Sequence, residues 1–206
     1  MSEAGAWEAL VRLMPPTTES DTSVDWDVMR DAWGKEFPPD YRRFIEVYGA
    51  GTIEDYLVVL GPEPKGGRPK AELSGMLHET ANAESAWARE PKARELAGAA
   101  PELIAWGADA SSDILCWDAS GDDPSTWPVL LRSRDDNLWR RYDCGMAEFL
   151  SRMLRADLDE NPLGDLALWG VQPATFLNER EEQRRLKQGL DPWTGEPDPY
   201  AGMYDD

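Results

Sequence analysis

Residues 103–143 read LIAWGADASSDILCWDASGDDPSTWPVLLRSRDDNLWRRYD, and this stretch decides the fold. Four short, mostly apolar runs lie at 103–109, 113–119, 127–133 and 137–143, separated by clusters of Gly, Asp, Ser and Pro. Because turn residues punctuate the runs at short spacing, the pattern is typical of strands joined by tight turns. We therefore expect an antiparallel meander of four strands.

Two segments on the N-terminal side extend this pattern. FPPDYRRFIEVYGAG, residues 37–51, predicts a helix that begins at the prolines and ends at the glycines. Its apolar side chains recur at helical spacing, at Tyr41, Phe44, Ile45 and Tyr48. TIEDYLVVLGP, residues 52–62, predicts one strand that ends at Gly61 and Pro62.

The other segments alternate between helical patterns and polar connections. Helices are expected at 3–14, at 24–34 with Ser23 or Asp25 as the cap, at 80–97 with a break near Pro91, and at 145–156. A linker is expected at 15–23 and a loop at 61–75, because both stretches are rich in residues that disfavour regular structure.

The character of the chain changes after Asn161 and Pro162. EREEQRRLKQG, residues 179–189, predicts a charged helix, and residues 191–206 are so rich in Pro, Gly and Asp that no regular structure is expected there. We therefore expect a domain over 1–160 and a C-terminal extension over 161–206. Four aromatic residues are expected to hold the extension on the domain, namely Trp169, Phe176, Trp193 and Tyr200.

The charge balance constrains the partners. The 206 residues include 40 Asp and Glu against 21 Lys and Arg, a net charge of −19. This field repels nucleic acid and anionic membranes, so neither is expected as a direct ligand, whereas basic proteins are attracted. The alternative is that the acidic balance only aids solubility. The start of the chain lacks a basic, apolar leader and no apolar run reaches membrane length, so a cytoplasmic protein is expected.

The aspartates of the meander do not match a known metal loop. Asp109, Ser111 and Asp113 occupy the first three ligand positions of an EF-hand, but Ile114 and Ser120 stand where the loop needs glycine and glutamate. An EF-hand is therefore rejected. A looser cation site stays open as an alternative, and no metal or other cofactor is predicted.

Catalytic patterns are equally weak. A carboxylate pair in a hydrolase remains an alternative, because the sequence does not give the separation of the two groups. His78 is the one histidine, and a Cys–His or Ser–His pair would have to use it. Cys116 lies inside an expected strand, whereas Cys144 precedes an expected helix, whose N-terminus would lower the thiol pKa. We expect no catalytic residues and a protein that is not an enzyme.

Two blocks of the chain resemble the SMI1/KNR4 family of the SUKH superfamily. EFPPDYRRFIEVYGAGTIEDYLVVLGP, residues 36–62, resembles the family's first signature block, with a Pro-Asp-Tyr helix start and a strand that ends at Gly-Pro. Residues 103–154 are similar to the C-terminal half of the family, from the Leu-Ile strand to the Phe-Leu helix. The chain departs from the family in its GADASSD turn, which replaces a more Gly-rich stretch, and in the extension after residue 160.

This resemblance implies an α+β fold in which helices pack on a curved, mainly antiparallel sheet. It also implies a role as the immunity protein of a bacterial polymorphic toxin system, which binds and blocks a cognate toxin domain, often a nuclease. Some relatives act instead as regulatory scaffolds or adaptors, and this remains the alternative. The oligomeric state stays open.

The same resemblance suggests a use for the aspartates at the turns. A nuclease site is basic because it attracts phosphate, and an acidic inhibitor surface can mimic that phosphate. The alternative is that Asp simply favours turns. The residues predicted to contact the partner are the turn aspartates with two aromatic anchors, namely Asp109, Asp113, Asp118, Asp122, Asp123, Asp135, Asp136, Trp127 and Trp139.

Overall fold

The computed structural model describes residues 3–17, 23–66 and 75–201, which form an α+β fold around one antiparallel sheet. The sheet has seven strands in the order β6-β5-β4-β3-β2-β1-β7. The strands are β1 Gly51–Ile53, β2 Leu57–Val59, β3 Leu103–Asp109, β4 Ile114–Asp118, β5 Val129–Ser133, β6 Leu138–Tyr142 and β7 Phe176–Asn178. The helices are α1 Glu3–Leu13, α2 Trp26–Trp33, α3 Pro39–Val47, α4 Met76–Arg89, α5 Met146–Leu154 and α6 Glu179–Lys187, with short 3-10 turns η1 Arg94–Leu96 and η2 Pro124–Thr126.

The predicted meander is confirmed. Strands β3 to β6 pair antiparallel with their neighbours in chain order, and one bulge interrupts β3 between Ala105 and Gly107. The predicted α+β class with a mainly antiparallel sheet is confirmed at the same time.

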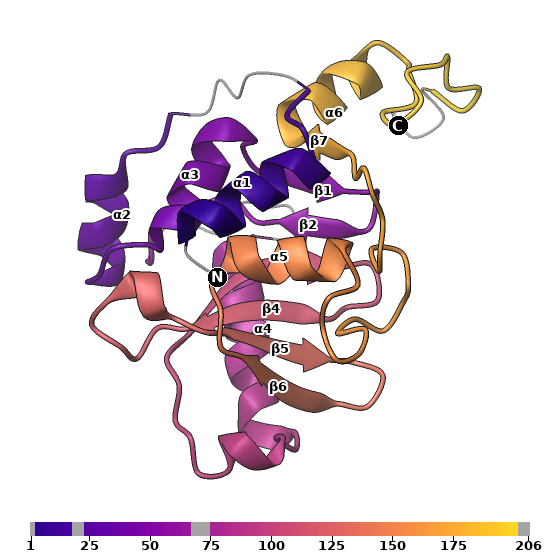
Figure 1. The fold of residues 1–206 in the computed structure, drawn as a ribbon. Coiled ribbons are helices and arrows are strands. Elements are labelled where there is room, and N and C mark those ends of the chain that lie inside the picture. The colour runs from indigo at the N-terminus through magenta and orange to yellow at the C-terminus, as the bar shows by residue number, and fades with distance from the viewer. Residues whose placement is uncertain (1–2, 18–22, 67–74, 202–206) are drawn as a thin grey trace.

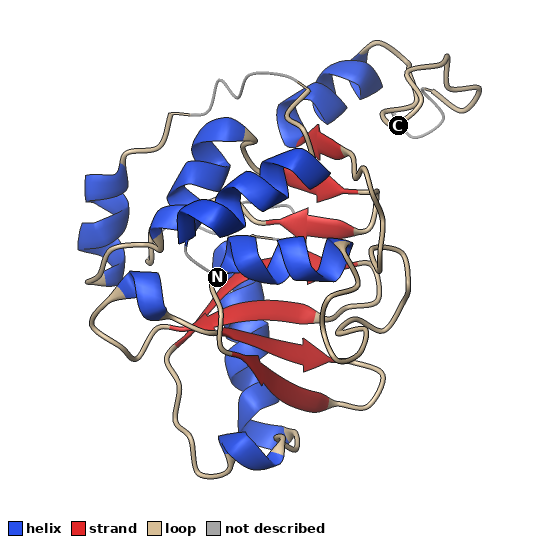
Figure 2. Cartoon of the chain, viewed as in Figure 1, coloured by secondary structure: helices blue, strands red, loops and turns tan. Residues whose placement is uncertain are grey.

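Helices cover both faces of the sheet centre (Figures 1 and 2). On the front face lie α1, α3 and α5, whereas α4 crosses the back face. Tyr41 of α3 packs edge-on against Trp117 of β4, with ring centroids 4.9 Å apart. On the back face, Trp87 of α4 packs in the same way on Trp139 of β6, at 5.1 Å. Because both faces are covered, β3 and β4 are buried almost throughout, without the inside–outside alternation of a one-sided sheet.

The expected single strand at 52–62 is wrong, because the segment forms a hairpin. Strands β1 and β2 pair with each other, and the backbone N–H of Tyr56 donates to the Ile53 carbonyl at 3.0 Å. Glu54 and Asp55 both adopt positive φ, at 51° and 53°. Two consecutive residues with positive φ give a turn that matches the right-handed twist of paired strands. The turn is not evident in the sequence, because the preferred Asn-Gly or Asp-Gly pair is absent.

The expected boundary at residue 160 is also wrong. Strand β7 pairs with β1 and so completes the sheet. A Cβ at Gly51 would lie 2.2 Å from the Leu177 carbonyl oxygen, so only glycine permits this approach. Several side chains from this region are buried in the core, namely Leu163, Leu168, Ala174 and Phe176. The domain therefore continues to residue 178, and only α6 and the chain after it lie outside the core.

The expected helix at 80–97 is shifted. Helix α4 begins at Met76 and ends at Arg89, before Pro91, and η1 follows as a separate turn.

Asp25 is the cap of α2, since its carboxylate accepts a hydrogen bond from the Val28 N–H at 3.1 Å. In the described parts of the chain, no helix combines the length and apolarity that a bilayer span requires.

Candidate functional site

Four of the residues predicted to contact a partner lie inside the protein. The exposed fractions are 8% for Asp109, 0% for Asp113, 2% for Trp127 and 0% for Trp139. The two tryptophans are packing residues, and the indole N–H of Trp127 donates to the Gly121 carbonyl at 2.7 Å. Asp113, Trp127 and Trp139 therefore do not form the accessible surface that was predicted, whereas Asp109 keeps a small exposed fraction.

Asp113 holds three loops together. Its Oδ1 accepts a hydrogen bond from the Arg134 N–H at 2.7 Å, and its Oδ2 accepts one from the Gly164 N–H at 2.8 Å. Arg134 belongs to the β5–β6 turn, and Gly164 to the segment that leads to β7. The carboxylate is thus occupied by backbone donors, which accounts for its burial.

Only one of the two carboxylate oxygens of Asp109 accepts hydrogen bonds within the described residues. Its Oδ1 accepts hydrogen bonds from the N–H groups of Ser111 and Asp113, both at 2.9 Å. Its Oδ2 is buried and receives no hydrogen bond from any described residue. Burial raises the pKa of Asp109 to about 6, and the negative charge of Asp113 adds to the shift, while the two N–H donors and the Tyr56 hydroxyl oppose it. The Tyr56 hydroxyl lies close enough to Asp109 to interact with it, but its direct hydrogen bond, at 2.8 Å, is with the Ser111 Oγ.

The exposed aspartates do not form one surface. Asp135 and Asp136 lie in the β5–β6 turn, whereas Asp122 and Asp123 lie in the β4–β5 connection at the opposite end of the meander. The five residues of β5 separate the two ends, a length of about 17 Å at roughly 3.3 Å per residue. Asp118 is mostly buried beside Arg141, at 3.8 Å. A partner would therefore contact one end of the meander or the other.

Arg140 engages one of these aspartates. Its guanidinium lies 2.5 Å from the Asp136 carboxylate, and this contact lowers the pKa of Asp136. Asp136 is thus already paired within the chain, and it offers less free charge to a partner than its exposure implies.

The thiols do not have the character of nucleophiles. Burial raises the pKa of Cys116, and it raises the pKa of Cys144 to about 12, with the Glu148 carboxylate adding to the shift. The prediction of a lowered pKa at Cys144 is therefore wrong, since desolvation outweighs the effect of the α5 N-terminus. His78 lies exposed in the first turn of α4.

A groove lies on the back face of the sheet. It consists of two adjoining hollows of about 690 Å³ and about 510 Å³, which share Thr52, Val58, Leu60 and Glu182. We call this continuous depression the back-face groove. One hollow runs beside α4 and the β3–β4 turn, and the other reaches Pro62 and the start of α2.

The register of the sheet explains why the groove is open. Directly paired residues share one face of a sheet, and one such row crosses all seven strands. From the β7 edge to the β6 edge it reads Leu177, Thr52, Val58, Ala108, Ile114, Arg132 and Trp139. Leu177, Ile114 and Trp139 in this row are buried, whereas Thr52, Val58 and Ala108 in the middle are partly exposed. These small side chains form the floor.

The groove is acidic. Its carboxylates are those of Asp25, Asp55, Glu63, Glu79, Glu90, Asp109, Asp113, Glu179 and Glu182, and its only basic side chains among the described residues are Arg89, Arg132, Arg134 and Arg180. Arg132 is held by Glu90 through two hydrogen bonds of 2.9 and 2.6 Å. Burial raises the pKa of Glu182, and the charges of Asp55 and Glu179 add to the shift. The field in the groove therefore favours a cationic ligand.

Of the predicted site residues, only Asp109 and Asp113 line this groove. The other lining residues come from α4, the β1–β2 turn, α6 and several further segments, and no local motif connects them. The α6 residues reach the groove because β7 returns to pair with β1 after more than a hundred intervening residues. The periodic spacing of Glu79, Asn82 and Arg89 on α4 is the one sequence signal that could have indicated a shared polar wall.

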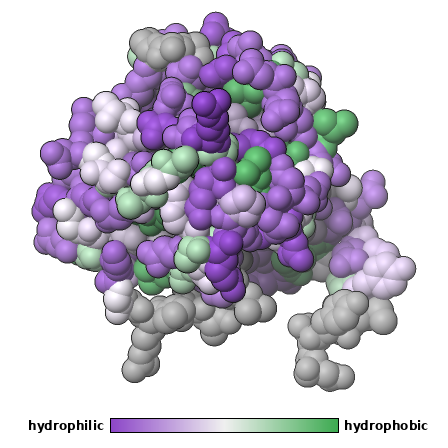
Figure 3. Space-filling model, turned by 90° about the horizontal axis from the view of Figure 1, so that it is seen from below, coloured by the Kyte–Doolittle hydropathy of each residue, from purple (hydrophilic) through white to green (hydrophobic). Residues whose placement is uncertain are grey.

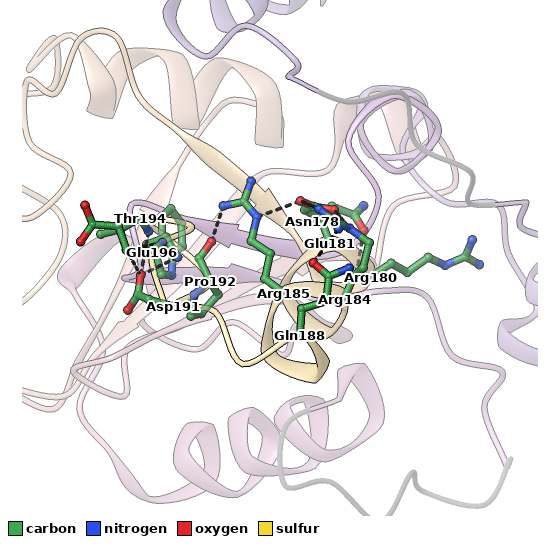
Figure 4. Close-up of polar contacts among 11 residues, drawn as sticks. Asn178, Arg180, Glu181, Arg184, Arg185, Gln188, Asp191, Pro192, Thr194 and Glu196 are labelled. Carbon is green, nitrogen blue, oxygen red and sulfur yellow. Dashed lines mark hydrogen bonds and ion pairs between the residues drawn. The ribbon is translucent and has the colours of Figure 1, made fainter. Parts of the chain in front are cut away.

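The segment after β7 forms a small unit of its own (Figure 4). Glu181 accepts hydrogen bonds from Arg184 and Arg185, which lower its pKa to about 2. Arg185 also donates to the Pro192 carbonyl, and Asp191 accepts from the Thr194 N–H at 2.7 Å. Residues 191–201 contain turns but no helix or strand. The unit projects from the domain beside β7 (Figure 1).

Of the aromatic residues expected to hold the extension, Phe176 is buried in β7 and Trp169 packs partly buried against the core. Tyr200 does not anchor the tail, because it is 65% exposed.

The face that carries η1 and the β6 edge differs in character from the groove. Figure 3 shows it covered mainly by hydrophilic side chains, with apolar ones scattered among them. Scattered apolar side chains are ordinary for a protein surface, so the back-face groove is the stronger candidate site.

Within the described residues, no cluster of three or more His, Cys, Asp or Glu side chains is placed to hold a metal ion. The alternative of a looser cation site at the aspartates therefore gains no support from the geometry. Comparisons of the chain with protein-family models, with curated proteins and with solved structures find no match.

Proposed function

We propose that this chain is a non-enzymatic binding protein, an immunity protein of the SMI1/KNR4 type that binds and neutralises a basic toxin domain. The observation that carries the proposal is the back-face groove, whose carboxylates outnumber its arginines. A groove with this charge attracts a cationic protein surface and repels nucleic acid. A nuclease toxin has such a surface, because its active site must attract phosphate.

The remaining acidic surface supports the same role at longer range. The net charge of −19 accelerates the approach of a basic partner at low salt. Asp122 and Asp123 are exposed at the far end of the meander from the β3–β4 turn. They contribute to this field without lining the groove, so their charge assists association rather than contact.

The side-chain geometry argues against a hydrolase that uses the Asp109–Asp113 pair. A carboxylate mechanism needs a second carboxylate that is free to act on substrate or water. Asp109 has Asp113 as its neighbour, but both oxygens of Asp113 are engaged by backbone N–H groups. The raised pKa values of both thiols keep them protonated at neutral pH.

One observation favours the scaffold alternative. The unit formed by α6 and residues 188–201 projects from the domain and presents Leu186, 51% exposed, and Tyr200, 65% exposed. A regulatory adaptor could use such a segment to recruit a second partner. The two functions differ in the part of the chain that they require.

The test is recovery of a partner from native lysate at about 50 mM and about 500 mM salt, where the Debye length falls from roughly 14 to 4 Å. We expect one basic partner, retained at low salt, whose toxicity disappears when this chain is co-expressed. The double change Glu79→Lys and Glu182→Lys, which reverses charge in the groove, should abolish protection.

The matched control is Asp122→Lys with Asp123→Lys, which changes the net charge equally outside the groove. It should slow association and retain protection. The immunity role would be contradicted if several partners were retained at both salt concentrations. It would also be contradicted if the chain protected cells from the toxin only after α6 was removed.

A further inference from the structure

The anchor of the further inference is the unpartnered oxygen of Asp109. This side chain lines the back-face groove and is more than nine-tenths buried. Its Oδ2 receives no hydrogen bond within the described residues, although its pair Oδ1 receives two. A buried polar atom without a donor is unfavourable and calls for a partner from outside the chain.

Two of the arginines that line the groove with this carboxylate are already engaged elsewhere. The Arg132 guanidinium holds Glu90 and also donates to the Ser112 carbonyl at 3.1 Å. Arg89 is turned back onto its own helix, where it donates to the Ser85 carbonyl at 3.0 Å and to the Ser85 hydroxyl at 2.9 Å. The Tyr56 hydroxyl is bonded to the Ser111 Oγ, and neither arginine supplies the missing donor, so a cationic side chain from a ligand is the complementary group.

The length of the groove indicates how much chain it accommodates. It follows β2 and the residues beyond it, from Tyr56 to Pro62. At roughly 3.3 Å per residue this path is about 20 Å long, which matches an extended segment of about six residues. Carboxylates occur along the whole path, at Asp55 beside one end, at Glu182 in the shared middle and at Glu63 beside the other end.

The width of the floor favours an extended segment over a helix. The partly exposed floor residues Thr52, Val58 and Ala108 sit on three adjacent strands, which span about 10 Å at roughly 4.8 Å between strands. A helix with its side chains measures about 10–12 Å across and would fill this space before its axis reached the floor. An extended chain can lie on the floor and direct alternate side chains to the acidic walls.

We infer that the back-face groove binds an extended, basic segment of the partner, and that Asp109 accepts a hydrogen bond from one of its cationic side chains. This inference rests on the proposed function and names the part of the toxin domain that the groove holds. It also assigns Asp109 a binding role that its burial alone does not reveal.

The test uses a fluorescein-labelled hexa-arginine peptide, with fluorescence anisotropy measured on the full chain at about 50 mM salt. Asp109→Asn keeps the shape of the side chain and removes its charge, and it should raise the Kd about tenfold. The control Asp122→Asn removes the same charge outside the groove and should change the Kd less than about twofold. Equal losses in both variants would show that only net charge matters, and would overturn the inference.

A second variant guards against an effect of folding. Val58→Trp fills the floor, and circular dichroism checks that each variant remains folded. Peptide binding should be lost in this variant. A peptide that alternates Arg and Pro, which cannot form a helix, should bind wild type at least as tightly as a helical peptide with the same arginine count. Unchanged binding to Val58→Trp, or a clear preference for the helix, would overturn the inference.

The same variants separate this inference from the proposed function. If Val58→Trp loses the peptide but still protects cells from the toxin, the groove is not where the toxin binds and the inference fails while the function stands. If the peptide binds as expected and no toxin is neutralised, the groove stands as a binding site for basic segments and the immunity role fails.

Discussion

Asp40 and Ala147 lie 107 residues apart in the sequence, and the Asp40 Oδ2 accepts a hydrogen bond of 2.9 Å from the Ala147 N–H. This bond caps the N-terminus of α5 with a carboxylate from the first turn of α3. The N-cap residue of α5 is Gly145, which has no side chain that could do so. The Asp40 Oδ1 accepts from the Tyr41 N–H at 2.8 Å. The contact joins α3 to α5, two helices that cover the same face of the sheet (Figure 1).

The first prediction concerns this buried cap. Asp40→Ala removes the acceptor and leaves the Ala147 N–H without a partner, so the free energy of unfolding should fall by about 2 kcal/mol. The control Asp25→Ala removes an exposed cap from α2 and should cost about 1 kcal/mol or less. Urea denaturation of the two variants measures both values. Equal losses of unfolding free energy in the two variants would contradict a larger contribution from the buried contact.

The second prediction concerns Asp113. Asp113→Ala leaves the N–H groups of Arg134 and Gly164 without an acceptor, so the free energy of unfolding should fall by about 2–3 kcal/mol. Asp122→Ala is the control, because this exposed side chain makes no such bonds, and its effect should stay within about 0.5 kcal/mol. If Asp113→Ala retained full stability and lost only partner binding, the original prediction of a contact residue would be restored.

The meander could be predicted because its signals are local. The turn residues around Ser112 and Gly121 lie between short apolar runs, and strands joined by short turns pair with their neighbours. The hairpin at Glu54 and Asp55 was missed because neither residue is the glycine or asparagine that usually marks such a turn. Strand β7 was missed because three residues carry little pattern and their partner β1 is far away in sequence.

The candidate site was harder to predict for two reasons. Alternation along a strand assigns side chains to faces but does not say which face a helix covers. For this reason Trp139, packed under Trp87, was mistaken for an accessible residue. The groove itself depends on the order of the strands, which brings Glu182 of α6 near Asp55 and the open floor at Val58. Neither fact is encoded in any single stretch.

The third prediction is a dependence of stability on pH at Asp109. Its pKa in the folded state is about 6, above the ordinary value of 3.8, so the folded protein binds this proton more tightly than the unfolded chain does. The resulting stabilisation is complete below about pH 4 and is lost as pH rises through about 6. Asp109→Asn cannot titrate, so its unfolding free energy relative to wild type should increase between pH 4 and pH 7. A constant difference across this range, measured by urea denaturation, would contradict the raised pKa.

The fourth prediction locates the end of the domain. A chain that stops after Glu160 lacks β7 and the buried Leu168 and Phe176, so it should show no cooperative unfolding transition. A chain that stops after Gln188 keeps the sheet and α6, and the described residues that it loses lie outside the buried core. Its melting temperature should fall by less than about 4 °C, which corresponds to about 1 kcal/mol in a protein of this size.

The same two truncations decide between the proposed functions. Because removal of residues 161–206 takes away part of the core, loss of a partner in that variant would report unfolding and not a recognition segment. The chain that stops after Gln188 keeps the back-face groove and loses Tyr200 with the turns around Asp191. An immunity protein that uses the groove should still neutralise its toxin in this form. Loss of partners from a variant that still melts cooperatively would instead favour the scaffold role and assign recognition to the tail.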